Sequence, residues 1–237
     1  MAESRDTRTR LLDAAAPLFA RDGFDAVSIR DIAGAADVNV AAVNYHFQGK
    51  ENLYREVLAR VVGGKRDRYV DGLRAIRDRR PGDLEAMIAG FFRLHFEDTL
   101  KTEAGGDFLR LLVREMHHGT PERAQLVAEL LVPMWEEVGR ALLADLPDVD
   151  HGVAPWLVGS LHGQLIHFTM RWLKADSCRD LLGRPGAAAM STVFPPLADD
   201  VDSYIERAVS HITRFTVAGI EAVLAENREP PADGDAT

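Results

Sequence analysis

The stretch Ser28–Phe47, which reads SIRDIAGAADVNVAAVNYHF, decides the fold. Ser28 is followed three residues later by Asp31, and this pair is a capping box with Asp in the acidic position, so it marks the start of a helix. Apolar residues then recur at helical spacing and give this short helix one buried face. They are Ile29, Ile32, Ala33 and Ala36.

A turn and a second helix follow at once. Asp37 and Val38 form a tight turn, and Asn39 is a favourable N-cap for the next helix. That helix is expected to run from Val40 to about Phe47. Two short helices joined by about three residues, the first carrying a small Ala33 that allows close approach, form a helix-turn-helix. In this motif the second helix lies in the DNA major groove and the first crosses the backbone.

The stretch and its flanks resemble the N-terminal DNA-binding domain of the TetR family of transcriptional regulators. The resemblance covers roughly Thr7 to Leu58, from LLDAAAPLFARDGFDAVSIRDIA to YHFQGKENLYREVL, and its most specific segment is YHF-x-x-K-E-x-L-Y. The variant VNVAAVNYHFQGKENLY is most similar to the subgroup that includes the CecR/YbiH-type regulators. Family members usually carry Gly where this chain has Asp37, but Asp tolerates the left-handed conformation that the turn requires.

The resemblance implies which side chains contact DNA. By position they are Ser28, Arg30, Val40, Ala41, Ala42, Asn44, Tyr45, His46 and Lys50. Side-chain chemistry agrees in several cases, because the Tyr45 hydroxyl and the Lys50 ammonium suit phosphate. Asn44 can form paired hydrogen bonds with adenine, and Arg30 can read guanine. The alternatives are that Tyr45 is an edge of the core and that His46 is an ordinary surface residue.

Charge is distributed unevenly along the 237 residues, whose formal net charge is -9. Residues 1–66 hold 10 Lys and Arg against 9 Asp and Glu, which leaves 18 against 28 in the remainder. Attraction to DNA depends on the local field and not on the total charge. Arg5, Arg8 and Arg10 are expected to form a basic arm before the body of a first helix that runs from about Thr7 to Asp22. The acidic remainder is expected to face away from phosphate.

Composition also excludes several classes of protein. The polar N-terminus, MAESRDTRTR, does not begin a signal peptide. The most apolar long run, Ala154 to Leu173, contains two histidines, a glutamine and an arginine, which favour a buried helix over a membrane span. A single cysteine, Cys178, excludes an internal disulfide and fits a reducing compartment. We therefore expect a cytoplasmic protein that associates with the nucleoid when it is bound to DNA.

The rest of the chain has helical periodicity and no convincing strand, so the predicted fold is all-α. The predicted domains are a helix-turn-helix head (residues 1–50), a helical ligand-binding and dimerisation body (51–227) and a disordered tail (228–237). Helices are expected over about residues 50–80, 84–100, 107–118, 121–146, 153–173 and 199–226, with loops over residues 101–106 and 175–196. Gly63 and Gly64 lie inside the first of these helices, either for close packing or as a soft joint between head and body.

A recognition helix of eight residues reads only a few base pairs, so we expect a homodimer, which the resemblance also implies. Two-fold pairing places two recognition helices about 34–36 Å apart on a palindromic operator. The predicted pairing surface is the last two long helices, Val153–Leu173 and Asp199–Glu226, two copies of which make a four-helix bundle. Gly159, Gly163 and Gly219 would let the backbones approach. The alternative is that both helices are internal core.

The resemblance further implies that the body holds a small-molecule effector, whose identity the sequence does not give. Aromatic walls with a few cationic or imidazole groups suit an aromatic or anionic organic ligand. The candidate lining residues are Phe92, His95, Phe96, Arg110, Arg114, Met116, His117, Trp135, Trp156, His162, His167, Phe168 and Arg171. Each of these residues could instead belong to an ordinary core.

An enzyme has little support in the sequence. The pairs His117-His118 and His162/His167 lack the spacing that places two metal ligands on one helical face, and no phosphate-binding loop or nucleophile motif occurs. No cofactor and no metal site is predicted. The predicted function is a sequence-specific transcriptional repressor that a small molecule releases from its operator. The alternatives are an activator or ligand-independent regulator, and a helical interaction module without DNA binding.

Overall fold

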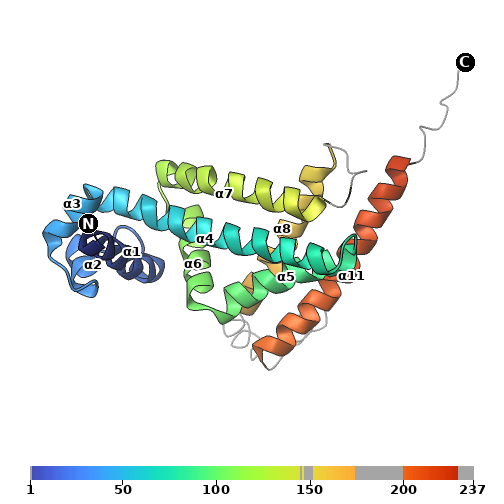
Figure 1. Ribbon diagram of the computed structural model, residues 1–237, viewed down its shortest axis with the longest axis horizontal. Coiled ribbons are helices and arrows are strands. Elements are labelled where there is room, and N and C mark those ends of the chain that lie inside the picture. Colours follow the sequence, from blue (N-terminus) through green and yellow to red (C-terminus); the bar gives the residue numbers. More distant parts are fainter. Residues whose placement is uncertain (1, 145, 147–151, 174–199, 229–237) are drawn as a thin grey trace, which may run out of the picture. The chain divides into compact units, whose positions relative to one another are not determined.

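A computed structural model describes residues 2–144, 146, 152–173 and 200–228, and every element within them is a helix (Figure 1). The predicted all-α fold is confirmed. The chain divides into two compact units, residues 1–68 with 101–137 and residues 69–100 with 138–237. The predicted functional boundary at residue 50 stays a prediction. The predicted connection over residues 175–196, Cys178 and the predicted tail from residue 229 lie outside the described residues.

Three helices at the N-terminus form the head of the first unit. They are α1 (Ala2–Asp22), α2 (Ile29–Ala35) and α3 (Val40–Phe47). Helix α1 begins at Ala2, so the predicted basic arm is wrong, and Arg5, Arg8 and Arg10 are part of the helix. The Arg8 guanidinium pairs with Glu56. Arg10 donates to the carbonyl oxygens of Ala36 and Asp37 at 2.6 and 3.0 Å, where it stabilises the end of α2.

The predicted caps of the two short helices are confirmed. The Ser28 hydroxyl accepts from the backbone N–H of Asp31 at 3.1 Å, and the Asp31 carboxylate accepts from the backbone N–H of Ser28 at 2.8 Å. The Asn39 side chain accepts from the backbone N–H of Ala41 at 2.8 Å. Asp37 adopts the expected left-handed conformation, with φ at +52°. These local bonds fix where α2 ends and where α3 begins.

The capping box predicts a pH-dependent stability. Hydrogen bonds from Ser28 hold the pKa of Asp31 below its usual value. Their stabilisation is therefore complete above the pKa of an unfolded Asp and is lost as the pH falls through the lower folded pKa. We expect Asp31→Asn to lower the thermal midpoint by roughly 1–3 °C at pH 7. The deficit relative to wild type should shrink below pH 4, whereas Thr102→Ala, which removes a neutral cap, should show a deficit that does not change with pH.

The head is held together by the apolar faces of its helices and by the start of α4 (Lys50–Arg79). The aromatic ring of Phe19 lies 4.8 Å from the ring of Tyr54, and Phe24 lies 5.1 Å from the same ring. Other buried residues of this core come from the four helices and, for Val27, from the loop between α1 and α2. They are Leu11, Leu12, Ala15, Val27, Ile32, Ala33, Val43, Phe47, Leu53 and Val57.

The first unit is completed by α6 (Glu103–His118) and the first part of α7 (Pro121–Leu143). The predicted loop over residues 101–106 is wrong, because only Thr102 separates α5 from α6. The Thr102 hydroxyl accepts from the backbone N–H of Gly105 at 3.0 Å and so caps α6. Gly105 and Gly106 lie in the first turn of that helix. Helix α7 ends at Leu143, three residues earlier than predicted.

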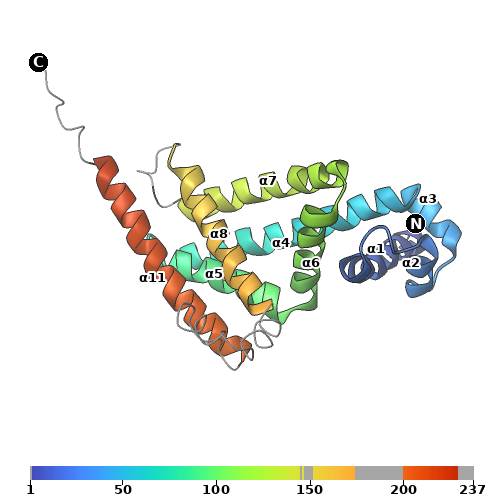
Figure 2. The ribbon, with the colours of Figure 1, turned by 180° about the vertical axis from the view of Figure 1, so that it is seen from behind.

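The second unit contains α5 (Leu84–Lys101), α8 (Ala154–Leu173) and α11 (Val201–Arg228), together with the last part of α4 (Figure 2). Helices α4 and α5 approach closely at Gly90, where a Cβ atom would lie 2.2 Å from the Cδ1 atom of Ile76. Helices α8 and α11 pack on each other, and the Tyr204 hydroxyl donates to the Phe168 carbonyl at 2.6 Å. By length and composition alone, Val201–Ala225 of α11 could cross a membrane, a test that core helices of soluble proteins also pass.

Candidate nucleic-acid interface

Helix α3 has one buried and one exposed face, as a recognition helix requires. Val43 and Phe47 are 0% and 2% exposed and anchor the helix to the head. The opposite face carries Ala41 and Asn44, which are exposed, and Tyr45, which is 79% exposed. A large aromatic ring held in solvent on a short, doubly anchored helix is available to a partner. The alternative interpretation of Tyr45 as a core edge is therefore wrong.

The chemistry of this exposed face suits the edges of base pairs. Val40, which is 40% exposed, and Ala41 offer methyl groups to thymine. Asn44 offers an amide donor and acceptor for adenine. The Tyr45 hydroxyl can donate to a phosphate oxygen. The exposed face of α3 thus combines two kinds of group. Its apolar side chains can contact thymine methyl groups, and its polar side chains can form hydrogen bonds with a phosphate or a base edge.

The other residues predicted to contact DNA differ in how exposed they are. Ser28 and Arg30 are exposed at the start of α2, whereas Ala42 and His46 are half-buried on α3. The Lys50 ammonium lies 4.4 Å from the centre of the Phe24 ring. Partial burial lowers the pKa of Lys50, and the carbonyl of Asp25 accepts from its ammonium at 3.5 Å. A phosphate contact by Lys50 stays a prediction.

The predicted effector-binding residues are spread over both units. Phe92, His95 and Phe96 are buried on α5, where the Nε2 atom of His95 lies 2.8 Å from the Thr169 hydroxyl and its Nδ1 atom bonds the Tyr69 hydroxyl. Others are exposed or half-buried, and the side chains of Met116 and His117 lie outside the described residues. The exposed ones are Arg110, Trp156 and His167, and the half-buried ones are Arg114, Trp135, His162, Phe168 and Arg171. Their role in binding an effector stays a prediction.

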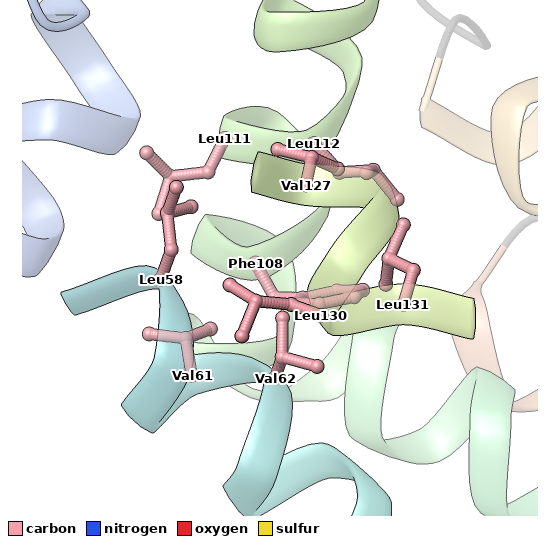
Figure 3. A pocket seen from close by; sticks show the side chains of 9 residues that line it. All are labelled: Leu58, Val61, Val62, Phe108, Leu111, Leu112, Val127, Leu130 and Leu131. Atoms are coloured by element: carbon pink, nitrogen blue, oxygen red, sulfur yellow. The ribbon is translucent and has the colours of Figure 1, made fainter. Parts of the chain in front are cut away.

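A small cavity of about 10 Å³ lies in the first unit, among residues that the sequence analysis did not select. Figure 3 shows that nine apolar side chains line it, from α4, α6 and α7. They are Leu58, Val61, Val62, Phe108, Leu111, Leu112, Val127, Leu130 and Leu131. Their helical spacing is visible in the sequence, but Leu, Val and Phe at such spacing are typical of any helical core and do not indicate a binding site. Among the described residues, no group of three His, Cys, Asp or Glu side chains could hold a metal ion.

Residues 11–57 match the family described as "Bacterial regulatory proteins, tetR family". The chain is 37% identical over 81 residues to the HTH-type transcriptional repressor KstR2 of Rhodococcus jostii, covering 34% of this chain and 39% of that protein. It is 38% identical over 55 residues to the HTH-type transcriptional regulator AcrR of Shigella flexneri, covering 23% of this chain and 26% of that protein. Each of these alignments therefore spans less than half of the curated relative.

Two solved structures are similar over most of the chain. One is the fatty acid degradation regulator FadR from Bacillus halodurans, with a TM-score of 0.58, 16% identity, and coverage of 86% of this chain and 92% of that one. The other is a transcriptional regulator of the TerR/AcrR family from Aquifex aeolicus, with a TM-score of 0.56, 14% identity, and coverage of 88% and 99%. At these identities the likeness is one of fold.

Proposed function

We propose that this chain is a TetR-family regulator, a sequence-specific DNA-binding repressor that acts on the nucleoid in the cytoplasm, because its residues 11–57 match that family of bacterial regulatory proteins. The observation that carries the proposal is the exposed face of α3, with Asn44 and Tyr45 displayed above buried Val43 and Phe47. Among its relatives, KstR2 is named a transcriptional repressor. Membership of the CecR/YbiH-type subgroup stays a prediction.

The proposed repressor is a homodimer that pairs through α8 and α11 on a palindromic operator. Both helices carry a large exposed apolar residue, Trp156 at 79% and Phe215 at 69% exposure. At Gly159, Gly163 and Gly219, a Cβ atom would meet no described heavy atom within 4 Å beyond its chain neighbours and the backbone of its own helix. Small residues beside exposed aromatic rings allow a second copy to approach closely and bury the rings.

In the proposed mechanism the ligand-free dimer holds two α3 helices at the operator spacing and blocks transcription. A small molecule that binds the body better in a second conformation shifts the dimer towards that conformation and releases the DNA. Only this difference in affinity between the two conformations supplies the free energy of release. The proposal requires no cofactor.

Selection of DNA from a random duplex pool, followed by an anisotropy titration, tests this function. We expect the purified full chain to select a palindrome and to bind it at least about a thousandfold more tightly than unrelated DNA. Deletion of the gene should raise expression from promoters that contain this palindrome, whereas lower expression would indicate an activator. Failure to prefer any sequence at physiological salt would leave a helical interaction module.

Gly63 and Gly64 provide a test of the proposed soft joint in α4. A Cβ atom at Gly63 would meet no described heavy atom within 4 Å, and at Gly64 it would meet only the mobile end of Arg68, at 3.4 Å. Close packing therefore does not explain them. Replacing both by Ala should raise the thermal midpoint, since each Gly costs about 1 kcal/mol in a helix interior.

The same double variant should weaken induction while operator affinity stays within twofold of wild type. Spin labels at position 51 of the two protomers would report the spread of head separations by pulsed electron resonance. We expect a narrower distance distribution in the Gly63→Ala, Gly64→Ala protein. A distribution as broad as that of wild type, or an equal loss of induction and operator binding, would reject the joint.

A further inference from the structure

Helices α4, α6 and α7 meet at a buried ion pair in the first unit. The Glu115 carboxylate on α6, whose residue is 3% exposed, accepts from the Tyr54 hydroxyl of α4 at 2.7 Å. It also accepts from the Nε atom of Arg123, near the start of α7, at 3.0 Å. Burial and the neighbouring carboxylate raise the pKa of Tyr54, which keeps the hydroxyl protonated as a donor. We name Tyr54, Glu115 and Arg123 the Glu115 cluster.

The Glu115 cluster also contacts the loop between α1 and α2. The Arg123 guanidinium lies 4.9 Å from the centre of the Phe24 ring, and its Nη2 atom lies 3.4 Å from the Asp25 carboxylate. The Tyr54 ring packs edge-on against Phe24 at 5.1 Å. This loop leads directly into the capping box of α2. A shift of Arg123 or Tyr54 would therefore displace the loop and, with it, the start of the helix-turn-helix.

A second contact from α6 acts on the same part of the head. Arg114, next to Glu115, donates to the backbone carbonyl of Arg21 at 2.8 Å, in the last turn of α1. The carbonyl oxygens at the end of a helix carry partial negative charge and lack partners within the helix, so a cation is stabilising there. Arg114 thus fastens α6 directly to the end of α1, and Glu115 is linked to the following loop through Arg123 and Tyr54.

The apolar cavity lies one helical turn from this cluster on each of the three helices. Leu58 follows Tyr54 by four residues, Leu111 precedes Glu115 by four, and Val127 follows Arg123 by four. Residues four apart lie on the same face of a helix. Figure 3 shows Leu58, Leu111 and Val127 around one space. The cavity and the cluster are therefore successive layers of one junction.

The cavity is too small for an organic molecule as it stands. Its volume of about 10 Å³ is close to that of a single water, yet its walls offer no polar group to hold one. A larger occupant enters only if α4, α6 and α7 separate at this layer. Because helices are stiff over one turn, the separation extends to the next layer, where Glu115 must bond Tyr54 and Arg123 at once. A buried charge is strongly destabilised when it loses a partner, so a separation that reached this layer would have to break the bonds of Glu115 at a large cost in free energy.

We propose that this cavity is the effector site of the repressor, that it takes an uncharged aliphatic molecule, and that filling it opens the Glu115 cluster and frees the head. The inference rests on the proposed function and adds the effector class and the route of coupling. All nine lining side chains are apolar, so a charged ligand would lose its hydration without compensation. An aliphatic chain gains from burial in such a site.

Glu115→Gln tests the route, because it keeps the shape of the side chain and removes the charge. We expect the variant to bind the selected palindrome about tenfold more weakly than wild type in an anisotropy titration. Tyr54→Phe removes only one hydroxyl and should also weaken operator affinity. It provides a second test of the route should Glu115→Gln fail to fold. Glu97→Gln breaks a partly exposed ion pair with Arg93 within α5, outside the proposed dimer interface, and is the matched control, with affinity unchanged. Wild-type affinity in both cluster variants would overturn the proposed route.

n-Octanol and octanoate test the effector class, with binding followed by calorimetry and operator release by anisotropy. We expect octanol to bind the wild-type dimer and to lower its operator affinity about tenfold, and octanoate to do neither. In Glu115→Gln octanol should still bind but release no further DNA. Val127→Phe, which fills the cavity, should abolish octanol binding, and Val61→Phe is a second filling variant should the first unfold.

The results of these experiments distinguish failure of the proposed effector site from failure of the proposed repressor function. If wild-type protein selects no palindrome, the proposed function fails. If it selects one and octanol has no effect, or octanoate acts as well as octanol, the effector class is overturned and the repressor stands. If octanol releases DNA equally from wild type and Glu115→Gln, the cavity is the site but the coupling through the Glu115 cluster is overturned.

Discussion

Phe215→Arg should convert the dimer into monomers and lower operator affinity by at least about a hundredfold, the largest effect that we expect from a single exposed residue. The Phe215 side chain stands 69% exposed on α11, and its burial between two copies would contribute apolar area at the centre of the proposed interface. An arginine there brings one like charge from each copy into the proposed interface. A monomer then binds each half-site separately and loses the gain in effective concentration that linked heads provide.

Sedimentation velocity and an anisotropy titration on the selected palindrome measure both effects. Val132→Arg is the matched control, because Val132 is also apolar and 55% exposed but lies on α7, outside the proposed interface. The Val132→Arg protein should keep the mass of a dimer in sedimentation and the operator affinity of wild type. Gly163→Leu, which adds bulk on α8 where the structure has open space, should weaken the dimer independently. A Phe215→Arg protein that remains dimeric would place the interface elsewhere.

Tyr45→Ala and Asn44→Ala should each weaken operator binding about ten- to a hundredfold without lowering the thermal midpoint. Asn44 is exposed and Tyr45 is 79% exposed, so neither contributes much to the core. The two losses should differ in kind. Loss of a phosphate contact at Tyr45 weakens binding to all sequences, whereas loss of paired hydrogen bonds at Asn44 relaxes the preference at one base pair.

Repeating the DNA selection with each variant separates these two effects. The Tyr45→Ala protein should select the wild-type palindrome from the pool, and the Asn44→Ala protein should accept other bases at one symmetric position. Gln125→Ala, an exposed amide on α7, is the control and should match wild type in affinity and in selected sequence. A fall in the thermal midpoint of Tyr45→Ala would assign the ring to packing. Unchanged affinity in both variants would remove α3 from the interface.

The head was predicted closely because its boundaries depend on local chemistry. A Ser28 hydroxyl and an Asp31 carboxylate three residues apart can bond each other's backbone wherever the chain goes, and they do. Asn39 begins α3 for the same reason. The predicted basic arm was wrong, because α1 begins at Ala2 and Arg8 and Arg10 bond distant residues, Glu56 on α4 and the end of α2. Such partners are invisible to a local pattern.

The proposed effector site was harder to predict, because the burial of side chains in the body is decided by how the helices pack. His95 has the chemistry of a ligand contact, yet its two ring nitrogens are engaged by Tyr69 and Thr169 within the second unit. The cavity, by contrast, is lined by Leu and Val side chains such as Leu58 and Val127, which are indistinguishable in the sequence from core. A loop was predicted over residues 101–106, but the Thr102 cap begins α6 directly after α5.

Helix α4 has a consequence for building hybrid regulators. One uninterrupted helix supplies Leu53 and Tyr54 to the core beneath α3 and, five turns later, Leu73 to the second unit. A graft that joins residues 1–50 to a foreign partner would leave the rings of Phe19 and Phe24 without Tyr54. A hybrid that keeps the operator specificity of this chain therefore needs a grafted segment that extends well into α4. The protein that receives the segment must also supply side chains equivalent to Glu115 and Arg123.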